Sequence, residues 1–250
     1  MKISIVTVCR NAVDTIEDTI LSVSGQTFDN TEHIIVDGGS SDGTLELVHK
    51  HESQITKWVS EPDDGIYDAM NKGIQMATGD VIGFLNADDI YAHSDVLART
   101  SEVMAEEGMQ ASYSDVIYVR DDLHTVVRYY CSRKFSPKRL SYGWMPAHPT
   151  LFLNRELFKQ YGMFKTDYQI AADFELVARL FGAHRVRYRY LPGVSVKMRM
   201  GGVSTKNIKS NIILSKEIVR ACRENGIKTS FPRVLLKYPL KMLERFVRPS

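Results

Sequence analysis

Residues 61–89 read EPDDGIYDAMNKGIQMATGDVIGFLNADD, and the fold is decided in this stretch. A polar loop leads into an amphipathic helix over 67–77, and a buried strand follows from Val81 to Leu85. The nearly continuous apolar run of this strand is typical of a strand covered on both faces. Asp88 and Asp89 end the run, which places two adjacent carboxylates at the carboxyl end of the strand, where open α/β sheets bind ligands.

Two adjacent carboxylates repel each other unless a cation or hydrogen-bond donors compensate their charge. Oxygen ligands suit a hard divalent ion, so Mg²⁺ or Mn²⁺ is the cofactor expected at Asp88 and Asp89. A turn stabilised by aspartate side chains, or a helix N-cap ahead of Ser94-Asp95, explains the same residues without a metal. The pair taken by itself leaves both explanations open.

The residues before this stretch alternate between strand and helix patterns. Strands are expected at 3–8, 33–37 and 55–59, and helices at 14–24 and from Thr44 onward. Such alternation predicts an α/β fold with a largely parallel central sheet, flanking helices and right-handed crossovers.

After Asp89 the pattern becomes mixed. The apolar spacing predicts strands at 111–118, 125–130, 150–153, 186–191 and 194–198, and helices at 95–107, 136–142, 154–161, 171–181 and 207–224. We therefore expect one catalytic domain over 1–205, with a nucleotide-binding half at 1–90 and an acceptor half at 91–205. A helical segment at 206–250 is expected to follow it.

Composition restricts the class of protein. The 250 residues are 44% hydrophobic and 25% charged, which is ordinary for a globular chain that can bury a core. Cys9, Cys131 and Cys222 lie far apart and form neither a disulfide framework nor a metal-binding pattern, so a reducing compartment is expected. The amino-terminal apolar run is short for a signal peptide, and no run reaches the length of a transmembrane helix. These features predict a cytoplasmic protein.

The last residues form a basic and apolar tail. Cations recur at spacings of four, four, four and three, which puts them on one stripe of a helix over 231–250: Arg233, Lys237, Lys241, Arg245 and Arg248. This pattern is typical of a helix in an anionic membrane interface, with a kink at Pro239, so we expect a peripheral position at the inner face of the cell membrane. A solvated face on a helix packed against the domain is the alternative. The tail is too short and too apolar for a nucleic-acid site.

Four loops should meet at one edge of the sheet, because each follows a strand: 7–11, 37–43, 61–68 and 86–89. They contain more carboxylates than the fold requires, namely Asp37, Asp63, Asp64, Asp88 and Asp89. A nucleotide would use them, since it needs acceptors for base N–H and ribose hydroxyl groups and a metal for its diphosphate. The glycines at 38–43 follow the second strand and do not match G-x-G-x-x-G, which disfavours a dinucleotide-binding protein.

Several motifs together resemble a known family: SIVTVCRNA at 4–12, GQTF at 25–28, EHIIVDGGSSDGT at 32–44 and the stretch from Ser60 to Asp89, followed by AHPTLF, AADFEL and GGVST. The chain resembles the inverting family-2 glycosyltransferases of the GT-A fold over about residues 1–205. It is most similar to bacterial enzymes that build exopolysaccharide, O-antigen or colanic-acid-type units on a lipid carrier.

The resemblance implies roles for individual residues. Asp89 would bind the cation that bridges the nucleotide diphosphate, and Asp88 would contact the ribose or the donor sugar. The nucleotide-sugar site would also include Thr7, Asn11, Asp37 and Asp64. Family members often carry a second acidic residue where this chain has Gly38, so the resemblance leaves the choice between a UDP-sugar and a GDP-sugar open.

Asp173 in AADFEL occupies the position of the family's general base, although the acidic residue that usually precedes it is Ala172 here. The chemistry requires such a base, because the acceptor hydroxyl must lose a proton on the side opposite the leaving diphosphate. An N-cap of the following helix is the alternative role for Asp173. Glu175 is the second candidate base, but two residues further along a helix it would point elsewhere.

Other candidates come from local spacing. Asp68 and Asn71 share one face of the 67–77 helix and could contact the donor, or they could be a solvated face. His148 could touch the acceptor or a phosphate, and a structural histidine is the alternative. Arg199 could reach the diphosphate if Gly201-Gly202 hinges a loop over it.

The expected function is metal-dependent transfer of a sugar from a nucleotide-diphosphate donor to a lipid-linked or saccharide acceptor, with inversion. Two alternatives remain at this point. A sugar-phosphate nucleotidyltransferase shares the sheet and the metal, but it would need a glycine-rich basic loop near the first strand. A non-catalytic membrane-associated scaffold would have little need of both Asp89 and Asp173.

Overall fold

The computed structural model describes residues 1–200 and 208–237. Its first half is a parallel sheet in the order β3-β2-β1-β4. The strands are β1 (Ile3–Cys9), β2 (Thr31–Asp37), β3 (Lys57–Ser60) and β4 (Val81–Phe84), and each neighbouring pair is parallel. β1 and β2 are buried along almost their whole length, as their runs of β-branched residues predict.

Helices connect these strands as crossovers. They are α1 (Ile16–Ser24), α2 (Thr44–Lys50), a 3₁₀ turn η1 (Glu52–Gln54) and α3 (Ile66–Met76). α3 packs directly on β1, because a Cβ placed on Gly73 would lie 2.2 Å from Cγ1 of Val6. This close packing fixes the loop that joins β3 to α3, and therefore the acidic residues in it.

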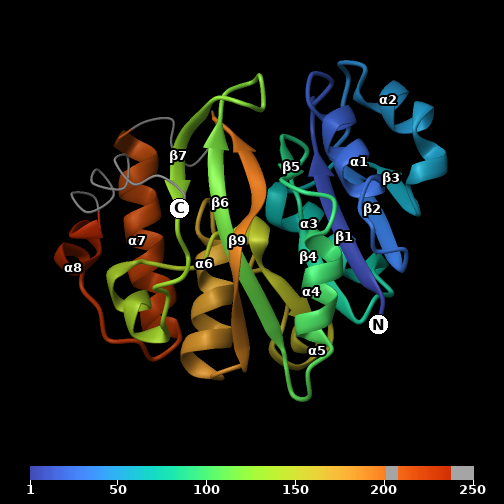
Figure 1. Cartoon of the computed structure of the whole chain (residues 1–250). Helices are drawn as coiled ribbons and strands as arrows, with labels where there is room; N and C mark the ends of the chain where they lie inside the picture. The colour runs from blue at the N-terminus through green and yellow to red at the C-terminus, as the bar shows by residue number, and fades with distance from the viewer. Residues whose placement is uncertain (201–207, 238–250) are drawn as a thin grey trace.

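The second half extends the same sheet with mixed strand directions (Figure 1). β8 (Phe152–Asn154) is antiparallel to β4 and to β6 (Ala111–Val119), while β6 is parallel to β9 (Tyr188–Arg199). β5 (Asp89–Tyr91) pairs antiparallel with β9, and β7 (Val126–Tyr130) pairs antiparallel with β6. The predicted α/β fold with a parallel first half and a mixed second half is confirmed.

The remaining elements are short except for one helix. They are α4 (Val96–Met104), the 3₁₀ turns η2 (Pro137–Tyr142) and η3 (His148–Thr150), α5 (Glu156–Tyr161), α6 (Ala172–Val177), the π-helical η4 (Ala178–Ala183), α7 (Ile208–Glu224) and α8 (Phe231–Leu235). Figure 1 shows α7 and α8 at the outer side of the second half, away from the β1–β3 region.

Three expected elements differ from the structure. The two strands expected at 186–191 and 194–198 are one strand, β9, because an irregular register opposite Asp115 accommodates Pro192-Gly193 without ending the pairing with β6. The helix expected at 171–181 changes to π-helical geometry after Val177. Asp89 begins the short strand β5, where no strand was expected.

One apolar cluster joins the two halves of the molecule. It contains Val6 and Phe84 from the parallel strands together with Tyr113 and Phe174 from the second half. Val234 of α8 belongs to the same cluster. The parts of the chain that carry the expected donor and acceptor sites therefore share a core, which holds the two sites in a fixed relation.

Within the described ranges, none of the helices is both long and apolar enough to cross a lipid bilayer.

The described part of the tail packs against the domain. Lys237 is 2% exposed, so the second cation of the expected stripe faces inward. The guanidinium of Arg233 lies 5.0 Å from the centre of the Tyr142 ring on η2. The expectation of a continuous outward-facing stripe is wrong for Lys237, because the helix buries that face against η2 and α7. Lys241, Arg245 and Arg248 lie outside the described residues.

Candidate active site

A turn joins β4 to β5 and carries the two adjacent carboxylates. The amide of Asp89 donates to the carbonyl of Asn86 at 3.0 Å, which closes the turn with Asp88 near its tip. Asn86 and Asp88 are half-buried, whereas Asp89 is 1% exposed. Both carboxylate oxygens of Asp89 are buried without a hydrogen-bond donor among the described residues. Burial, followed by the charge of Asp88, raises the pKa of Asp89 well above its usual range.

Arg199 holds this turn. Its guanidinium donates to the backbone carbonyl of Asp88 at 3.0 Å and to the carboxylate of Asp18 on α1. It is 8% exposed. Two of its N–H groups are thus engaged with the chain, and the expected contact between Arg199 and the diphosphate stays a prediction.

Asp37, at the end of β2, shapes its own loop. Its carboxylate accepts hydrogen bonds from the amides of Gly39 and Ser40 at 3.1 and 2.9 Å and from the hydroxyl of Ser60 at 2.7 Å. The Ser40 hydroxyl also donates to it. Although burial alone would raise the pKa of Asp37, these hydrogen bonds hold it below its usual value. A contact to a nucleoside is not supported, because the buried carboxylate is saturated by its own loop.

The two other candidates at the β1 end differ in their accessibility. Thr7 is fully buried, and its hydroxyl lies 3.0 Å from Nε2 of His33 within the sheet. Asn11 is exposed and accepts the amide of Ser41 at 3.0 Å, which ties the loop after β1 to the loop after β2. The backbone of Asn11 is left-handed, with φ at +51°. Asn11 therefore stays accessible to a ligand, and Thr7 does not.

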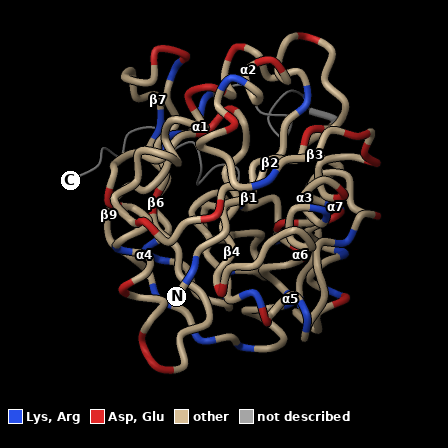
Figure 2. Tube along the Cα trace, turned by 90° about the vertical axis from the view of Figure 1, so that its right-hand side faces the viewer, with Lys and Arg blue, Asp and Glu red and all other residues tan. Residues whose placement is uncertain are grey.

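The loop after β3 is held by a lysine. Lys72 on α3 lies 2.8 Å from Glu61 and 3.3 Å from Asp68, and it donates to the carbonyl of Pro62 at 3.0 Å. Asp68 also accepts the amide of Asp64 at 3.3 Å. Asp68 thus positions the loop, while the Asp64 side chain is exposed. Figure 2 shows acidic segments gathered at the edge of the molecule near α2 and β3.

Asn71 connects α3 to the chain ahead of α6. Its amide nitrogen donates to the carbonyl of Phe164 at 2.8 Å, and its oxygen accepts the amide of Phe164 at 2.9 Å. The expected donor contact is not supported, since both polar atoms of Asn71 are used in this clamp. The neighbouring Tyr67 donates to the carbonyl of Ile170 at 2.5 Å, so α3 holds the approach to Asp173 at two points.

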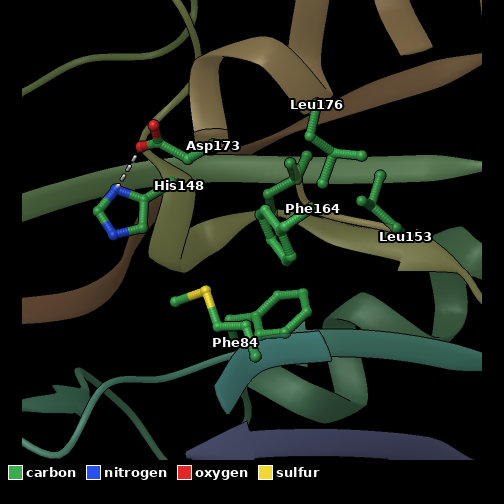
Figure 3. A pocket seen from close by; sticks show the side chains of 8 residues that line it. Phe84, His148, Leu153, Phe164, Asp173 and Leu176 are labelled. Atoms are coloured by element: carbon green, nitrogen blue, oxygen red, sulfur yellow. Dashed lines mark ion pairs between the residues drawn. The ribbon is translucent and has the colours of Figure 1, made fainter. Parts of the chain in front are cut away.

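Asp173 and His148 face each other at one side of a small cavity (Figure 3). Nδ1 of His148 lies 3.6 Å from Oδ2 of Asp173. The rest of the cavity wall is apolar and includes Phe84 of β4 and Phe164. Phe84 is the last residue of β4, so the cavity lies beside the strand that leads into the turn at 86–89.

The environment of Asp173 suits a proton acceptor. Burial raises the pKa of Asp173, while the charge of His148 and the amide of Phe174 oppose the rise. The side chain keeps 27% of its surface exposed, so it remains open to a substrate hydroxyl. The amide of Phe174 donates to Oδ1 at 2.7 Å, which leaves Oδ2 facing His148. A raised pKa at an accessible carboxylate is typical of a general base.

Glu175 is excluded as an alternative base. It is fully buried and lies 2.8 Å from Arg179 and 3.2 Å from Lys165. Asn225 of the segment after α7 donates to it at 3.2 Å. A carboxylate paired in this way stabilises the packing of α6, and its burial keeps it out of reach of a substrate.

Glu217 on α7 is a positioning residue that the sequence gives no reason to select. Its carboxylate accepts the amides of Gln169, Ile170 and Ala171 at 2.7, 3.0 and 2.9 Å. These amides precede the first turn of α6 and would otherwise lack acceptors. Glu217 therefore fixes the backbone that presents Asp173, from a helix far away in the sequence.

The turn at 86–89 fits a hard divalent ion. Within the described part of the chain, no three His, Cys, Asp or Glu side chains gather closely enough to hold a metal by themselves. Mg²⁺ and Mn²⁺ sites need no more than one or two carboxylates when substrate phosphates and water supply the other ligands. The half-buried Asp88 and Asn86 offer such oxygens at the sheet edge, whereas Asp89 is enclosed.

Sequence comparison places the chain in a family. A family profile described as Glycosyl transferase family 2 matches residues 4–170. An uncharacterised glycosyltransferase of Mycobacterium tuberculosis (strain ATCC 25618 / H37Rv) is 32% identical over 179 residues, covering 71% of this chain and 68% of its own. A PGL/p-HBAD biosynthesis glycosyltransferase of Mycobacterium bovis (strain BCG / Pasteur 1173P2) is 30% identical over 203 residues, covering 80% of this chain and 75% of its own.

Solved structures share the fold. S. aureus TarS, residues 1–349, in complex with UDP-GlcNAc, matches 91% of this chain and 68% of its own with a TM-score of 0.71 and 15% identity. The mannosyltransferase PcManGT from Pyrobaculum calidifontis, in complex with GDP-Man and Mn²⁺, matches 89% of this chain and 63% of its own with a TM-score of 0.64 and 21% identity. With a GT-A-type sheet, carboxylates at its edge and this family match, the chain belongs to glycosyl transferase family 2.

Proposed function

We propose that this protein transfers a sugar from a nucleoside-diphosphate donor to a lipid-linked or saccharide acceptor with inversion, in the synthesis of bacterial surface polysaccharide. Asp173 is the observation that carries the proposal. It is an accessible carboxylate with a raised pKa, and it shares a cavity with β4, whose end carries Asp88. The family match favours this reaction over nucleotidyl transfer.

The carboxylate of Asp173 accepts the proton of the acceptor hydroxyl as the oxygen attacks the anomeric carbon. The bond between that carbon and the diphosphate oxygen breaks on the opposite face, and the configuration inverts. His148, at 3.6 Å, favours the ionised form of Asp173 and orients it. The reaction then needs no covalent intermediate, since one carboxylate acting as the base suffices for a single displacement.

The donor diphosphate is proposed to lie at the turn after β4. Asp88 and Asn86 would hold a Mn²⁺ or Mg²⁺ ion there, and Asp89, whose backbone amide donates to the carbonyl of Asn86, would lie beneath the turn. This exchanges the roles that the motif suggested for the two aspartates, because Asp89 is 1% exposed. When bound, the ion offsets the negative charge that develops on the leaving diphosphate. The Mn²⁺ bound with GDP-Man in PcManGT supports a divalent ion beside the donor, without naming its ligands.

The base assignment is tested by Asp173→Asn. We expect kcat to fall by about 10²–10⁴-fold, as is usual when a general base is lost. Donor binding in the presence of Mn²⁺, measured by calorimetry, should stay within about twofold of the parent. Asp29→Asn is the matched control, because Asp29 is an exposed carboxylate ahead of β2, at the other end of that strand. Unchanged turnover in Asp173→Asn would refute the assignment.

The ion assignment is tested by comparing Asp88→Asn with Asp89→Asn. We expect Asp88→Asn to lose the Mn²⁺-dependent part of UDP or GDP binding. Asp89→Asn should keep it and should change the melting temperature instead. If Asp89→Asn instead loses this binding and Asp88→Asn keeps it, Asp89 is the residue that holds the ion. The buried carboxylate would then become accessible when the donor binds.

Contact with an anionic membrane surface is part of the proposal. It is now supported by exposed apolar residues of the tail more than by its cations, because Lys237 is buried. Phe231 and Leu235 on α8 and Leu236 at its C-terminal cap are 36%, 40% and 56% exposed, and together they form an exposed apolar group. The exposed Arg233 lies on the same short helix. Such a combination suits insertion into a lipid headgroup layer, where a lipid-linked acceptor would be found.

A further inference from the structure

Gly38, in the loop after β2, faces a space that another loop has filled. A Cβ placed on Gly38 would lie 2.2 Å from Oδ2 and 3.0 Å from Cγ of Asp63, which follows β3. Cδ of Arg10 lies 3.5 Å from the same point. The carboxylate of Asp63 therefore stands where a side chain at position 38 would begin.

This glycine is required for space and not for backbone freedom. Its neighbour Gly39 has a positive φ of 78°, which favours glycine, whereas Gly38 does not. The Asp63 side chain is anchored, because its Oδ1 accepts the amide of Gly65 at 3.0 Å. The two loops are also joined through the backbone, since the amide of Glu61 donates to the carbonyl of Asp37 at 3.0 Å. The Asp63 carboxylate thus keeps its position over Gly38.

The topology indicates what lies above this position. The sheet order reverses between β1 and β4, since β2 and β3 lie on one side of β1 and β4 on the other. Ligands of open α/β sheets bind at such a point, outside the carboxyl ends of the strands. If the diphosphate lies at Asp88 on the β4 side, the nucleoside extends over the ends of β1, β2 and β3. Gly38 and Asp63 lie at those ends.

We propose that Asp63 selects the nucleobase of the donor by accepting its ring N–H group. This inference rests on the proposed function and names the class of donor. A carboxylate accepts N3–H of uracil, or N1–H together with the amino group of guanine, and the second oxygen of Asp63 is free of the Gly65 contact. Asp37 cannot take this role, because its own loop saturates it.

Comparing CDP with UDP and GDP tests whether a carboxylate contacts the edge of the base or the base is only stacked in the site. The ring nitrogen N3 of cytosine carries no hydrogen and presents a lone pair, so it opposes a carboxylate where uracil would donate to it. A hydrogen bond to a charged group changes affinity by about tenfold or more. We therefore expect the protein with Mn²⁺ to bind UDP or GDP, whichever is tighter, about tenfold more tightly than CDP.

Asp63→Asn provides the first test by calorimetry with UDP, GDP and CDP. The asparagine oxygen can still accept the Gly65 amide, so the melting temperature should not change. Its amide group can donate to N3 of cytosine, so the preference over CDP should shrink to about threefold or less. Asp14→Asn, an exposed carboxylate near the same edge, should retain the preference. A preference that survives in Asp63→Asn overturns the inference.

Moving the carboxylate provides the second test. Gly38→Asp alone should lose nucleotide binding, because its Cβ collides with Asp63. Combining it with Asp63→Gly removes the collision and supplies a carboxylate from the other loop. The double variant should recover binding to within about threefold of the parent and should restore the discrimination against CDP. A double variant no better than Gly38→Asp alone would show that the space is structural.

Different results would refute the proposed function and the role of Asp63. If the parent protein with Mn²⁺ binds none of the three nucleoside diphosphates, the proposed function itself fails. If it binds them but Asp63→Asn and Asp14→Asn show the same preference, only the assignment of Asp63 fails.

Discussion

The pair of Asp173 and His148 shows how single side chains set the chemistry of the site. Burial raises the pKa of the Asp173 carboxyl group, and the nearby imidazole opposes the rise. In the proposed reaction the Asp173 carboxylate is the base, so both effects on its pKa bear on proton transfer. His148 is a positioning residue in this scheme, since it acts through Asp173 and not on the substrate.

His148→Gln tests that coupling. Removing the charge opposite Asp173 should raise the pKa of the carboxyl group further, because burial is then less opposed. The base is active when deprotonated, so the acid limb of the kcat/KM profile should move to higher pH. Activity below the limb should fall by about tenfold. His93→Gln, an exposed histidine, serves as the control. An acid limb that stays in place would contradict the coupling.

Asp173→Asn should also affect stability. The folded-state pKa of Asp173 is raised, so its protonated form favours folding. That contribution is present below the unfolded pKa and is lost as pH rises through the folded pKa. At neutral pH the amide should therefore match or exceed the parent in melting temperature, and the difference should shrink as pH falls. A clear loss of stability at neutral pH would show that the ionised carboxylate stabilises the fold.

Among the elements, α7 and α3 position the segment ahead of Asp173. Glu217 on this helix accepts three successive amides ahead of α6, and Tyr67 on α3 holds a carbonyl of the same segment. Short helices such as α6 are marginal by themselves, so their position is set by these tertiary contacts. The segment before Asp173 is thus fixed from two sides.

Glu217→Ala tests this role. Three amides would lose an acceptor, so we expect about 1.5–3 kcal/mol of lost stability, or a melting temperature lower by about 3–12 °C. We also expect kcat to fall by about tenfold or more, with donor KM unchanged. Glu224→Gln lies on the same helix and contacts Lys165 and Arg220, so it is the matched control. A change in donor KM without a change in kcat would contradict a role at Asp173.

At the scale of the whole molecule, donor and acceptor regions share one core, and the described part of the tail packs against the outer side of the second half. Lys237 is buried, and Leu235 and Leu236 are exposed. The proposed membrane face is therefore the apolar side of α8, with Arg233 beside it. This arrangement brings any bound lipid surface to the half that contains Asp173.

Leu235→Glu with Leu236→Glu tests the membrane face. Two new charges on the exposed side of α8 should reduce co-sedimentation with phosphatidylglycerol vesicles by about tenfold or more, because apolar insertion is lost. Val126→Glu with Val127→Glu is the control, since that pair is also exposed, on β7. Deleting 238–250 separately measures the contribution of the remaining cations. Unchanged binding in both the α8 variant and the deletion would refute membrane association through the tail.

The sequence was sufficient for some residues and not for others, for identifiable reasons. Strand and helix periodicity predicts β1, β2, β4 and α3, since these elements bury a regular pattern of side chains. The motif around Asp88 predicts a polar turn at the correct edge. Thr7, Asn71 and Arg199 were expected at the ligand, but their hydrogen-bond partners come from distant segments that no local pattern reveals.

The sequence by itself determined the α/β class, the sheet edge that gathers the loops, and the carboxylates placed there. These follow from local periodicity and from the rule that parallel strands end together. Tertiary structure alone decided which carboxylates stay available. Asp37 is hydrogen-bonded by its own loop and by Ser60, and Glu175 is paired with Arg179. Asp173 keeps an open face, and Asp63 takes the space over Gly38. The reason is physical: accessibility and hydrogen-bond saturation depend on neighbours in space, which the linear pattern around a residue does not specify.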